Sequence, residues 1–498
     1  MNVNPITRLD YPDPDVIRVE DTYYMVSTTM HFMPGCEILQ SFDLVHWEHV
    51  TYVYETLDHT DAQQLKSGQN IYGQGMWAAS LRYHEGRFYI CFVANDTRKT
   101  YLYTSEKIDG PWKKQLIEGF YHDGSLLFDE DGRNYIVYGN DEIWITELNE
   151  DLTAPKKDGL HRLLVSDHKN PELGYEGSHI QKINGYYYIF LVHSLRDRWM
   201  RTEACFYSDS LEGEFTGGDV LCDDRGYCGQ GVAQGGIVDT PDGKWYAMLF
   251  QDSGAVGRIP ILLPVTWKDH FPIFGQNGHV PEEIEVHSTR PGYIYQPLVG
   301  SDDFCNGLLP RWQFNHDPDP RYYHLDALQG TYTITTREVC TGLTQAVNTL
   351  TQRMSYPSCA AEVTVDASAL KEGDVAGLCA LQSCYAAVGI TKHHGKYEVL
   401  MLDKKEDGIL DMTEGTVVES HQMDFRLEAD FCNMKDEARC YYRVNKGDWL
   451  PIGTVHKLYF KLDHFTGCRF GLFCYAAEET GGSACFRDFK YYDVDEIS

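Results

Sequence analysis

A short phrase occurs five times in the first half of the chain, and it limits the fold more than any other feature of the sequence. Each copy is a turn of Asp or Asn, mostly with Gly, that leads into aromatic and β-branched residues, which is the pattern of a β-hairpin. The copies are EDTYYMV, EGRFYICF, DGRNYIVY, NGYYYIFL and DGKWYAML, and they share a tyrosine at Tyr24, Tyr89, Tyr135, Tyr188 and Tyr246. Successive tyrosines are 65, 46, 53 and 58 residues apart. Repeats of about this length, each with several short strands, are typical of propeller blades, so the sequence predicts an all-β chain that opens with a five-bladed β-propeller.

The repeat also defines five matched positions. Twelve residues before each tyrosine, or 11 in the first copy, the chain has Asp13, Trp77, Asp123, Glu176 and Gln234. Equivalent positions of a propeller lie around one axis. If these positions begin the innermost strands, three carboxyl groups converge at the mouth of the central channel. Like charges at short range oppose joint ionisation, so we interpret the cluster as a functional site.

Glycoside hydrolysis is the chemistry that uses such a cluster. One carboxyl group must be protonated to give a proton to the leaving oxygen, and another must be ionised to activate water or to attack directly. A third carboxylate close to the acid raises the pKa of that acid by repulsion. The sequence does not give the distance between the two catalytic carboxyl groups, which distinguishes an inverting from a retaining enzyme.

The surroundings of these positions favour a site but leave simpler alternatives open. Pro12 and Pro14 restrict the backbone on both sides of Asp13, which otherwise reads as a surface turn. Trp77 fits the core between blades as well as it fits a sugar platform. Arg258, which follows Tyr246 by 12 residues, either balances the acids and binds hydroxyl groups or lies at the surface. Gln234, followed by two glycines, is placed to form hydrogen bonds near the axis.

A second domain is predicted in the C-terminal part of the chain. The 498 residues are too many for one ordinary core, and a polar, proline-containing stretch ends near residue 295. From Ser301 onward, short alternating segments such as GTYTITT, CAAEVTVDA and CRFGLFCYA follow at spacings typical of a β-sandwich or jelly roll. We therefore predict a catalytic propeller over residues 1–297 and a sandwich over residues 301–498.

Charge and cysteine content narrow the partners and the location. The formal net charge of −31 disfavours binding to nucleic acid phosphates or to anionic lipid. The N-terminus lacks the apolar core of a signal peptide, and no run of apolar residues approaches the length of a membrane span. The 15 cysteines form no CxxC pair and no zinc-type spacing. Many free thiols without an export signal indicate a reducing cytoplasm, while the oligomeric state, including a homo-oligomer, stays open.

The segments around these residues resemble glycoside hydrolase family 43, five-bladed enzymes of the β-xylosidase and α-L-arabinofuranosidase type. YPDPDVIRVEDTYYMVST is similar to the general-base motif of the family, and the resemblance places the base on Asp13. GYEGSHIQKINGYYY is similar to the general-acid motif and implies Glu176 as the acid. YHDGSLLFDEDGRNY matches the segment of the third acid, so Asp123 is implied to tune the pKa of the acid and to orient substrate.

Further segments extend the resemblance over both domains. GQGMWAASLRYHEGRFY carries the tryptophan segment at Trp77, and GAVGRIPILLPVTW carries an arginine, here Arg258, that approaches the third acid. SDDFCNGLLPRWQFNHDPDP resembles the opening of the concanavalin-like C-terminal β-sandwich of many family β-xylosidases. A loop of that sandwich closes part of the sugar pocket in those enzymes, and the HFTG segment implies Phe465 for this role.

The sequence also departs from the family pattern at two places. Many members have a histidine, sometimes near a bound calcium, at the axial position of Gln234. We therefore predict that no cofactor is required, assign no metal ligand, and leave a structural calcium open. In TTMHFMPGCE the aromatic positions of the first sugar subsite are shifted, and Met30 and Phe32 are the candidates.

These observations predict a cytoplasmic, exo-acting glycosidase that releases xylose or arabinose from short oligosaccharides. The family is associated with inversion, which implies that Asp13 activates water opposite Glu176. An α-L-arabinofuranosidase or a dual-specificity enzyme is the first alternative to a β-1,4-xylosidase. A non-catalytic carbohydrate-binding propeller is a more remote one, because a lectin has no use for a proton donor, and a retaining propeller glycosidase is the third.

Overall fold

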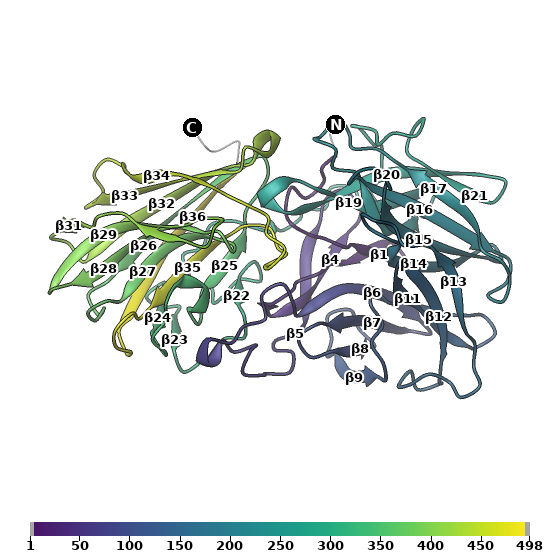
Figure 1. Cartoon of the computed structure of the whole chain (residues 1–498), viewed down its shortest axis with the longest axis horizontal. Helices are drawn as coiled ribbons and strands as arrows, with labels where there is room; N and C mark the ends of the chain where they lie inside the picture. Colours follow the sequence, from purple (N-terminus) through teal and green to yellow (C-terminus); the bar gives the residue numbers. More distant parts are fainter. Residues whose placement is uncertain (1–3, 494–498) are drawn as a thin grey trace.

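The computed structural model describes residues 4–493 and is built almost wholly of β-strands. Four short 3₁₀ helices, Lys66–Gly68, Gly254–Val256, Leu343–Gln345 and Cys432–Met434, are the helical segments of this described part. None of its helices is long and apolar enough to span a membrane. The N-terminal and C-terminal halves form two β-rich bodies that lie side by side (Figure 1).

The first body is a five-bladed β-propeller, which confirms the prediction from the repeat. Five antiparallel sheets of four strands each follow one another along the chain. In chain order, the blades are β1 (Asp15–Val19), β2 (Thr22–Val26), β4 (Gly35–Ser41) and β5 (Glu48–Tyr54); β6 (Met76–His84), β7 (Arg87–Ala94), β8 (Lys99–Ser105) and β9 (Lys113–Ile117); β10 (Ser125–Phe128), β11 (Asn134–Asn140), β12 (Glu142–Leu148) and β13 (His161–Ser166); β14 (Glu176–Ile183), β15 (Tyr186–Ser194), β16 (Arg201–Ser208) and β17 (Thr216–Leu221); β18 (Ala233–Asp239), β19 (Trp245–Asp252), β20 (Arg258–Lys268) and β21 (Phe271–Phe274).

The first strands of the blades surround the axis. β1 contacts β6 and β18, and β10 and β14 complete a closed ring of neighbouring first strands. The five shared tyrosines all lie on the second strands, opposite Ile17, Arg82, Leu127, Gln181 and Val238 of the first strands. The repeated phrase is thus the hairpin that joins the first and second strands of each blade.

The second body is a β-sandwich of two antiparallel sheets, as predicted. Apolar side chains from both sheets interleave in one core, with Leu350, Leu378, Phe425 and Phe486 among its fully buried members. One sheet contains β22 (Gln313–Asn315), β25 (Leu350–Arg353), β27 (Val375–Leu381), β28 (Ala386–His393), β29 (Lys396–Lys404), β30 (Leu410–Met412), β31 (Thr416–Val418) and β35 (Arg469–Tyr475). The other contains β23 (Tyr323–Asp326), β24 (Thr331–Thr335), β26 (Ser358–Asp366), β32 (Gln422–Asp430), β33 (Glu437–Val444), β34 (Leu450–Lys457) and β36 (Ser483–Asp493).

A short strand of the first blade joins the two bodies. β3 (Phe32–Met33) leaves the propeller chain and pairs with β22, so it becomes the edge strand of the larger sandwich sheet. The segment between β34 and β35 crosses in the other direction and reaches the propeller (Figure 1), where the backbone N–H of Cys468 donates to the carbonyl of Ala255. The domains therefore exchange elements rather than touch at a flat surface.

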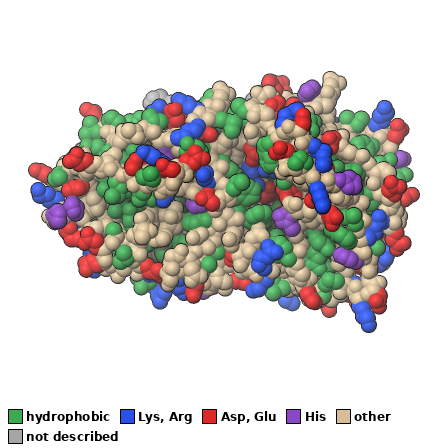
Figure 2. All heavy atoms as spheres, in the orientation of Figure 1, with side chains coloured by type: hydrophobic (Ala, Val, Ile, Leu, Met, Phe, Trp, Pro, Cys, Tyr) green, Lys and Arg blue, Asp and Glu red, His purple; other side chains and the backbone are tan. Residues whose placement is uncertain are grey.

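A buried ion pair lies at this junction. The Arg353 guanidinium of β25 is 2.8 Å from the carboxylate of Glu37 in β4, and both side chains are less than 5% exposed. Arg353 also donates to the carbonyl of Asp10 and to the hydroxyl of Tyr11. By contrast, acidic and basic side chains are interspersed over the face shown in Figure 2.

Candidate active site

The five matched positions lie at the same end of the ring of first strands. Asp13 and Asp123 stand two residues before β1 and β10, Glu176 begins β14, and Trp77 and Gln234 are the second residues of β6 and β18. β-bulges interrupt β6, β14 and β18 just after their first residues. A bulge adds a residue and turns the strand, and this shifts the start of each strand relative to its partner.

Two of the three acids meet around a histidine. Nε2 of His122 is 3.5 Å from Oδ2 of Asp123 and 3.4 Å from Oε2 of Glu176. The side-chain amide of Asn140 donates to the same Glu176 oxygen at 2.6 Å. The backbone N–H of Gly177 donates to Asp123 at 2.9 Å, so the residue that follows one acid orients the other.

Asp13 is held by an arginine and a threonine, so Arg258 contacts Asp13 and not Asp123, the acid that the family resemblance implied for it. Arg258 Nη1 is 3.2 Å from Oδ1 of Asp13, and the Thr28 hydroxyl donates to Oδ2 at 2.6 Å. Asp13 is 6% exposed and Arg258 is 2% exposed. Asp13 adopts a positive φ of 53°, a backbone conformation that is uncommon for residues other than glycine. Its carboxylate is therefore fixed in direction by both its backbone and its partners.

The acids also share an electrostatic environment. Burial and the nearby carboxylates of Glu176 and Asp13 raise the pKa of Asp123 to about 6, although the charge of His122 opposes this rise. The carboxylate of Asp123 raises the pKa of His122 to about 9 against the effect of burial, with further contributions from Glu176 and Asp13. His122 therefore carries a positive charge at neutral pH and partly balances the three acids.

An aromatic pair from both domains borders the acids. The Trp77 ring lies 5.8 Å from the ring of His122 and 5.6 Å from that of Phe465, measured between centroids. Phe465, in the segment between β34 and β35, lies under the Arg258 guanidinium at 4.3 Å, and its carbonyl accepts from Arg258 at 3.4 Å. The structure thus brings the sandwich residue named from the sequence to the propeller site.

Three residues that the sequence suggested for substrate contact are almost completely buried. Phe32 of β3 is 2% exposed, and its ring is covered by the guanidinium of Arg469 at 3.4 Å. This is because β3 is recruited to the sandwich sheet. Met30 is 2% exposed and is paired through its backbone with Met76. Gln234 is 4% exposed, and its side chain lies against Gly177. Its backbone N–H donates to the carboxylate of buried Glu203 at 2.7 Å.

Several residues of the site were missed in the sequence. His122 directly precedes Asp123, and its position in YHDG was a signal that could have been followed. Asn140 and Thr28 gave no such signal, because each reaches the acids only through the pairing of β11 or β2 with its neighbour. Buried Arg201 adds a positive charge and is paired with Asp252 at 2.9 Å. Burial lowers the pKa of its guanidinium, but the carboxylates of Asp252, Glu176 and Asp13 outweigh this effect and raise the pKa.

In the described part of the chain, one group of side chains brings donor atoms close enough to share a cation. His122, Asp123 and Glu176 each present such an atom within 4.8 Å of the others. We assign no metal to this group, because the Glu176 oxygen already accepts from Asn140 and the carboxyl groups are the acids of the cluster.

Comparisons with known proteins agree with this architecture. The family model of glycosyl hydrolases family 43 matches residues 3–272, and that of the beta xylosidase C-terminal concanavalin A-like domain matches residues 301–492. A beta-xylosidase of Formosa agariphila is 27% identical over 99% of this chain and 89% of its own length. A non-reducing end alpha-L-arabinofuranosidase of Bacteroides ovatus is 26% identical over 66% of the chain and 63% of its own length.

Solved structures extend the likeness to the whole described fold. A bifunctional GH43-CE protein of Bacteroides eggerthii is 42% identical, with a TM-score of 0.93. It covers 100% of this chain, whereas the chain spans only 64% of the length of that protein. An engineered GH43 glycoside hydrolase described as displaying endo-xylanase and exo-arabinofuranosidase activity is 28% identical with a TM-score of 0.86, over 99% of both chains.

Proposed function

The chain belongs to glycosyl hydrolases family 43, and from this premise we propose that it is an exo-acting β-xylosidase. It would release xylose from the non-reducing ends of short oligosaccharides. The observation that carries the proposal is the convergence of Asp13, Asp123 and Glu176 at one end of the propeller axis, with the charges of all three acting on His122. Relatives named for xylosidase activity support the choice of xylose.

Each acid has a separate task in the proposed mechanism. Glu176 gives its proton to the glycosidic oxygen as the bond to the anomeric carbon breaks. Asp13, held by Arg258 and Thr28, takes a proton from the water that attacks that carbon from the opposite face. This single displacement inverts the anomeric carbon and leaves no covalent intermediate.

Asp123 and His122 support the reaction, Asp123 at the sugar ring and His122 at the acid. Asp123 is fixed by the N–H of Gly177, and His122 lies between it and Glu176. We propose that the ionised Asp123 stabilises positive charge that develops on the sugar ring, because a buried carboxylate in a water-poor site acts strongly on nearby charge. His122 holds Glu176 through a hydrogen bond at 3.4 Å and stays within ion-pair distance of Asp123.

Side-by-side assays test the substrate. Aryl β-D-xyloside is expected to be hydrolysed faster than aryl α-L-arabinofuranoside. The second candidate, an arabinofuranosidase or a dual enzyme, has its own support from relatives named for arabinosidase activity. Faster hydrolysis of the arabinofuranoside would favour that candidate. If neither substrate is hydrolysed, the proposal is contradicted.

The pH dependence follows from the shifted pKa of Asp123. We expect kcat/KM for an aryl xyloside to fall below about pH 6, since the proposed role of Asp123 needs its ionised form and Asp123 is protonated below that value. The charge of His122 lowers the pKa of Asp123, so the His122→Gln variant should move the acidic limb to higher pH. A limb near pH 4, or one that the variant leaves in place, would contradict this assignment.

The contribution of the sandwich is tested through Phe465. Phe465→Ala is expected to raise KM for xylobiose by about fivefold, because it removes an aromatic wall worth about 1 kcal/mol, while kcat changes little. Leu462→Ala is the matched control, since Leu462 belongs to the same segment and is 76% exposed. Equal KM values in both variants would show that Phe465 does not contribute to substrate binding.

We also propose a reducing compartment, the cytoplasm, as the location. All 15 cysteines lie in the described part of the chain and carry free thiols, ten of them buried, and this supports folding without disulfides. Recovery of the protein from an oxidising compartment of its native cells, in a fractionation experiment, would contradict this proposal.

A further inference from the structure

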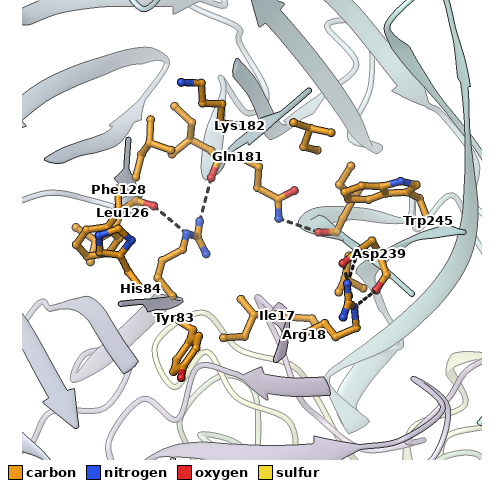
Figure 3. Close-up of a pocket in the computed structure, with 17 residues that line it drawn as sticks. Ile17, Arg18, Tyr83, His84, Leu126, Phe128, Gln181, Lys182, Asp239 and Trp245 are labelled. Atoms are coloured by element: carbon orange, nitrogen blue, oxygen red, sulfur yellow. Dashed lines mark hydrogen bonds and ion pairs between the residues drawn. The ribbon is translucent and has the colours of Figure 1, made fainter. Parts of the chain in front are cut away.

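A second hollow opens at the opposite end of the propeller axis from the acids. Its volume is about 410 Å³, within the range of small-ligand pockets. All five first strands line it, together with Trp245 at the start of β19 (Figure 3). We call it the channel-end hollow; its lining includes Arg18, Arg82, Tyr83, His84, Phe128, Gln181, Lys182, Asp239 and Trp245.

A layer of paired polar groups separates this hollow from the acids. The Arg82 guanidinium donates to Asp15, to Ser125 and to the carbonyls of Leu126 and Ile180. His179 bonds to the other oxygen of Asp15 at 3.1 Å. Asp13 precedes β1, whereas Arg18 lies near the far end of that strand, and the step from Asp15 to Arg18 alone spans about 10 Å at the rise of a β-strand. A ligand here would therefore not touch the reacting sugar.

The charged groups of the hollow already have partners. Arg18 is paired with Asp239, Lys182 with Asp129 at 2.6 Å, and Arg82 with Asp15 at 2.8 Å. An ionic ligand would therefore find no unpaired countercharge and would have to break an existing pair, with the loss of its energy. This favours a neutral ligand.

The groups left for a ligand are neutral and aromatic. Gln181 donates its amide N–H to the carbonyl of Ile237 at 2.8 Å, and its oxygen has no donor among the described residues. In Figure 3 this amide and the Trp245 ring approach the hollow from neighbouring blades. His84 stacks on Phe128 with centroids 4.7 Å apart at 8°, and this flat surface forms the opposite wall. Aromatic faces with uncharged hydrogen-bonding groups suit the apolar faces and hydroxyl groups of sugars.

We propose that the channel-end hollow is a second sugar-binding site, in which Trp245 packs against a sugar ring and the Gln181 oxygen accepts from a hydroxyl group. The class of ligand, a neutral hydroxylated molecule, follows from the hollow itself. The narrower choice of a pentose, the terminal xylose of an oligosaccharide, rests on the proposed function. Such a site would keep the protein bound to its oligosaccharide substrate at a point away from the bond that is cleaved.

The test is a count of binding sites for xylotriose by isothermal titration calorimetry. In the full chain with Glu176→Gln, which slows hydrolysis, we expect two sites per chain. Adding Trp245→Ala is expected to weaken one of them by about tenfold and to leave the other unchanged. Trp144→Ala is the matched control, because Trp144 lies in β12, outside the hollow, and stacks on His161.

Each outcome decides the proposal. One site in the Glu176→Gln chain, or two sites that persist unchanged after Trp245→Ala, would overturn it. If Trp245→Ala does not fold, as judged by its thermal unfolding, the Gln181→Leu variant takes its place with the same expected loss. Hydrolysis of aryl xyloside by the unaltered chain is measured separately. An inactive chain that still binds two xylotriose molecules would refute the proposed function and retain the second site.

Discussion

Replacement of Glu176 by glutamine is expected to lower kcat for xylobiose by about 10²–10⁴-fold, the usual contribution of a general acid. Glutamine keeps the shape of the side chain and can still contact Asn140 and His122, but it has no proton to give to the leaving sugar. KM should change much less, because the ground-state contacts remain. Steady-state kinetics on xylobiose measure both quantities.

The leaving group provides an internal control for this variant. An aryl xyloside with an acidic phenol needs little protonation, so its hydrolysis should fall by far less than that of xylobiose. Glu172→Gln is the matched variant, since Glu172 lies four residues earlier and is exposed, and it should retain the activity of the unaltered chain. Undiminished hydrolysis of xylobiose by Glu176→Gln would show that Glu176 is not the general acid.

The second large effect is expected at the domain junction. Arg353→Met leaves the Glu37 carboxylate buried without its cation, and loss of one partner of a buried pair costs about 3–5 kcal/mol. The free energy of unfolding, measured by chemical denaturation, should fall by that amount. Replacing both residues, as in Glu37→Leu with Arg353→Met, should restore much of the loss, because the uncompensated charge is then absent. Arg133→Ala is the surface control, since Arg133 and Asp131 are each about half exposed, and such pairs contribute at most about 1 kcal/mol.

The same ion pair gives a pH dependence with a definite sign. Burial alone would raise the pKa of Glu37, but the charge of Arg353 and the hydrogen bond from His49 together lower it to about 2. A carboxyl group whose pKa is lower in the folded state adds stability that is fully present above its unfolded pKa. That stability disappears as the pH falls toward the folded value. Acid unfolding between about pH 4.5 and pH 2 should thus be steeper in the unaltered chain than in the double variant. Equal slopes would contradict the role of this pair.

Arg258 connects Asp13, the proposed catalytic base, to the second domain. It contacts the Asp13 carboxylate through one nitrogen and both the ring and the carbonyl of Phe465 through the other side of its guanidinium. Asp10, three residues before Asp13, accepts from the N–H groups of Arg258 and Gly467. The position of Asp13 thus depends on the docking of the sandwich.

The five-fold phrase was enough to predict the propeller, because each copy encodes one complete hairpin and can be recognised although the intervals between copies vary with loop length. The alternating segments after Ser301 predicted the sandwich for a similar reason. The convergence of Asp13, Asp123 and Glu176 could also be anticipated, since matched positions of a closed ring of strands face one axis. The roles of these residues in catalysis remain predictions for the experiments above.

Long-range pairing could not be read from the sequence. Phe32 looked like a wall of the sugar pocket, but β3 pairs with a strand nearly 300 residues away and carries its ring into the sandwich. Asn140, at the end of β11, and Thr28, two residues after β2, contact the acids only after those strands are folded against the first strands. The ion pair of Glu37 and Arg353 likewise depends on the docking of two separately encoded domains.

A crystal structure of the Glu176→Gln chain with bound xylobiose tests the central claim most directly. The claim predicts that the terminal xylose lies at the acid end of the axis, with Asp13 across its anomeric carbon from residue 176 and Asp123 beside the ring. A well-ordered sugar that binds elsewhere, or that touches only one of these three side chains, would contradict it.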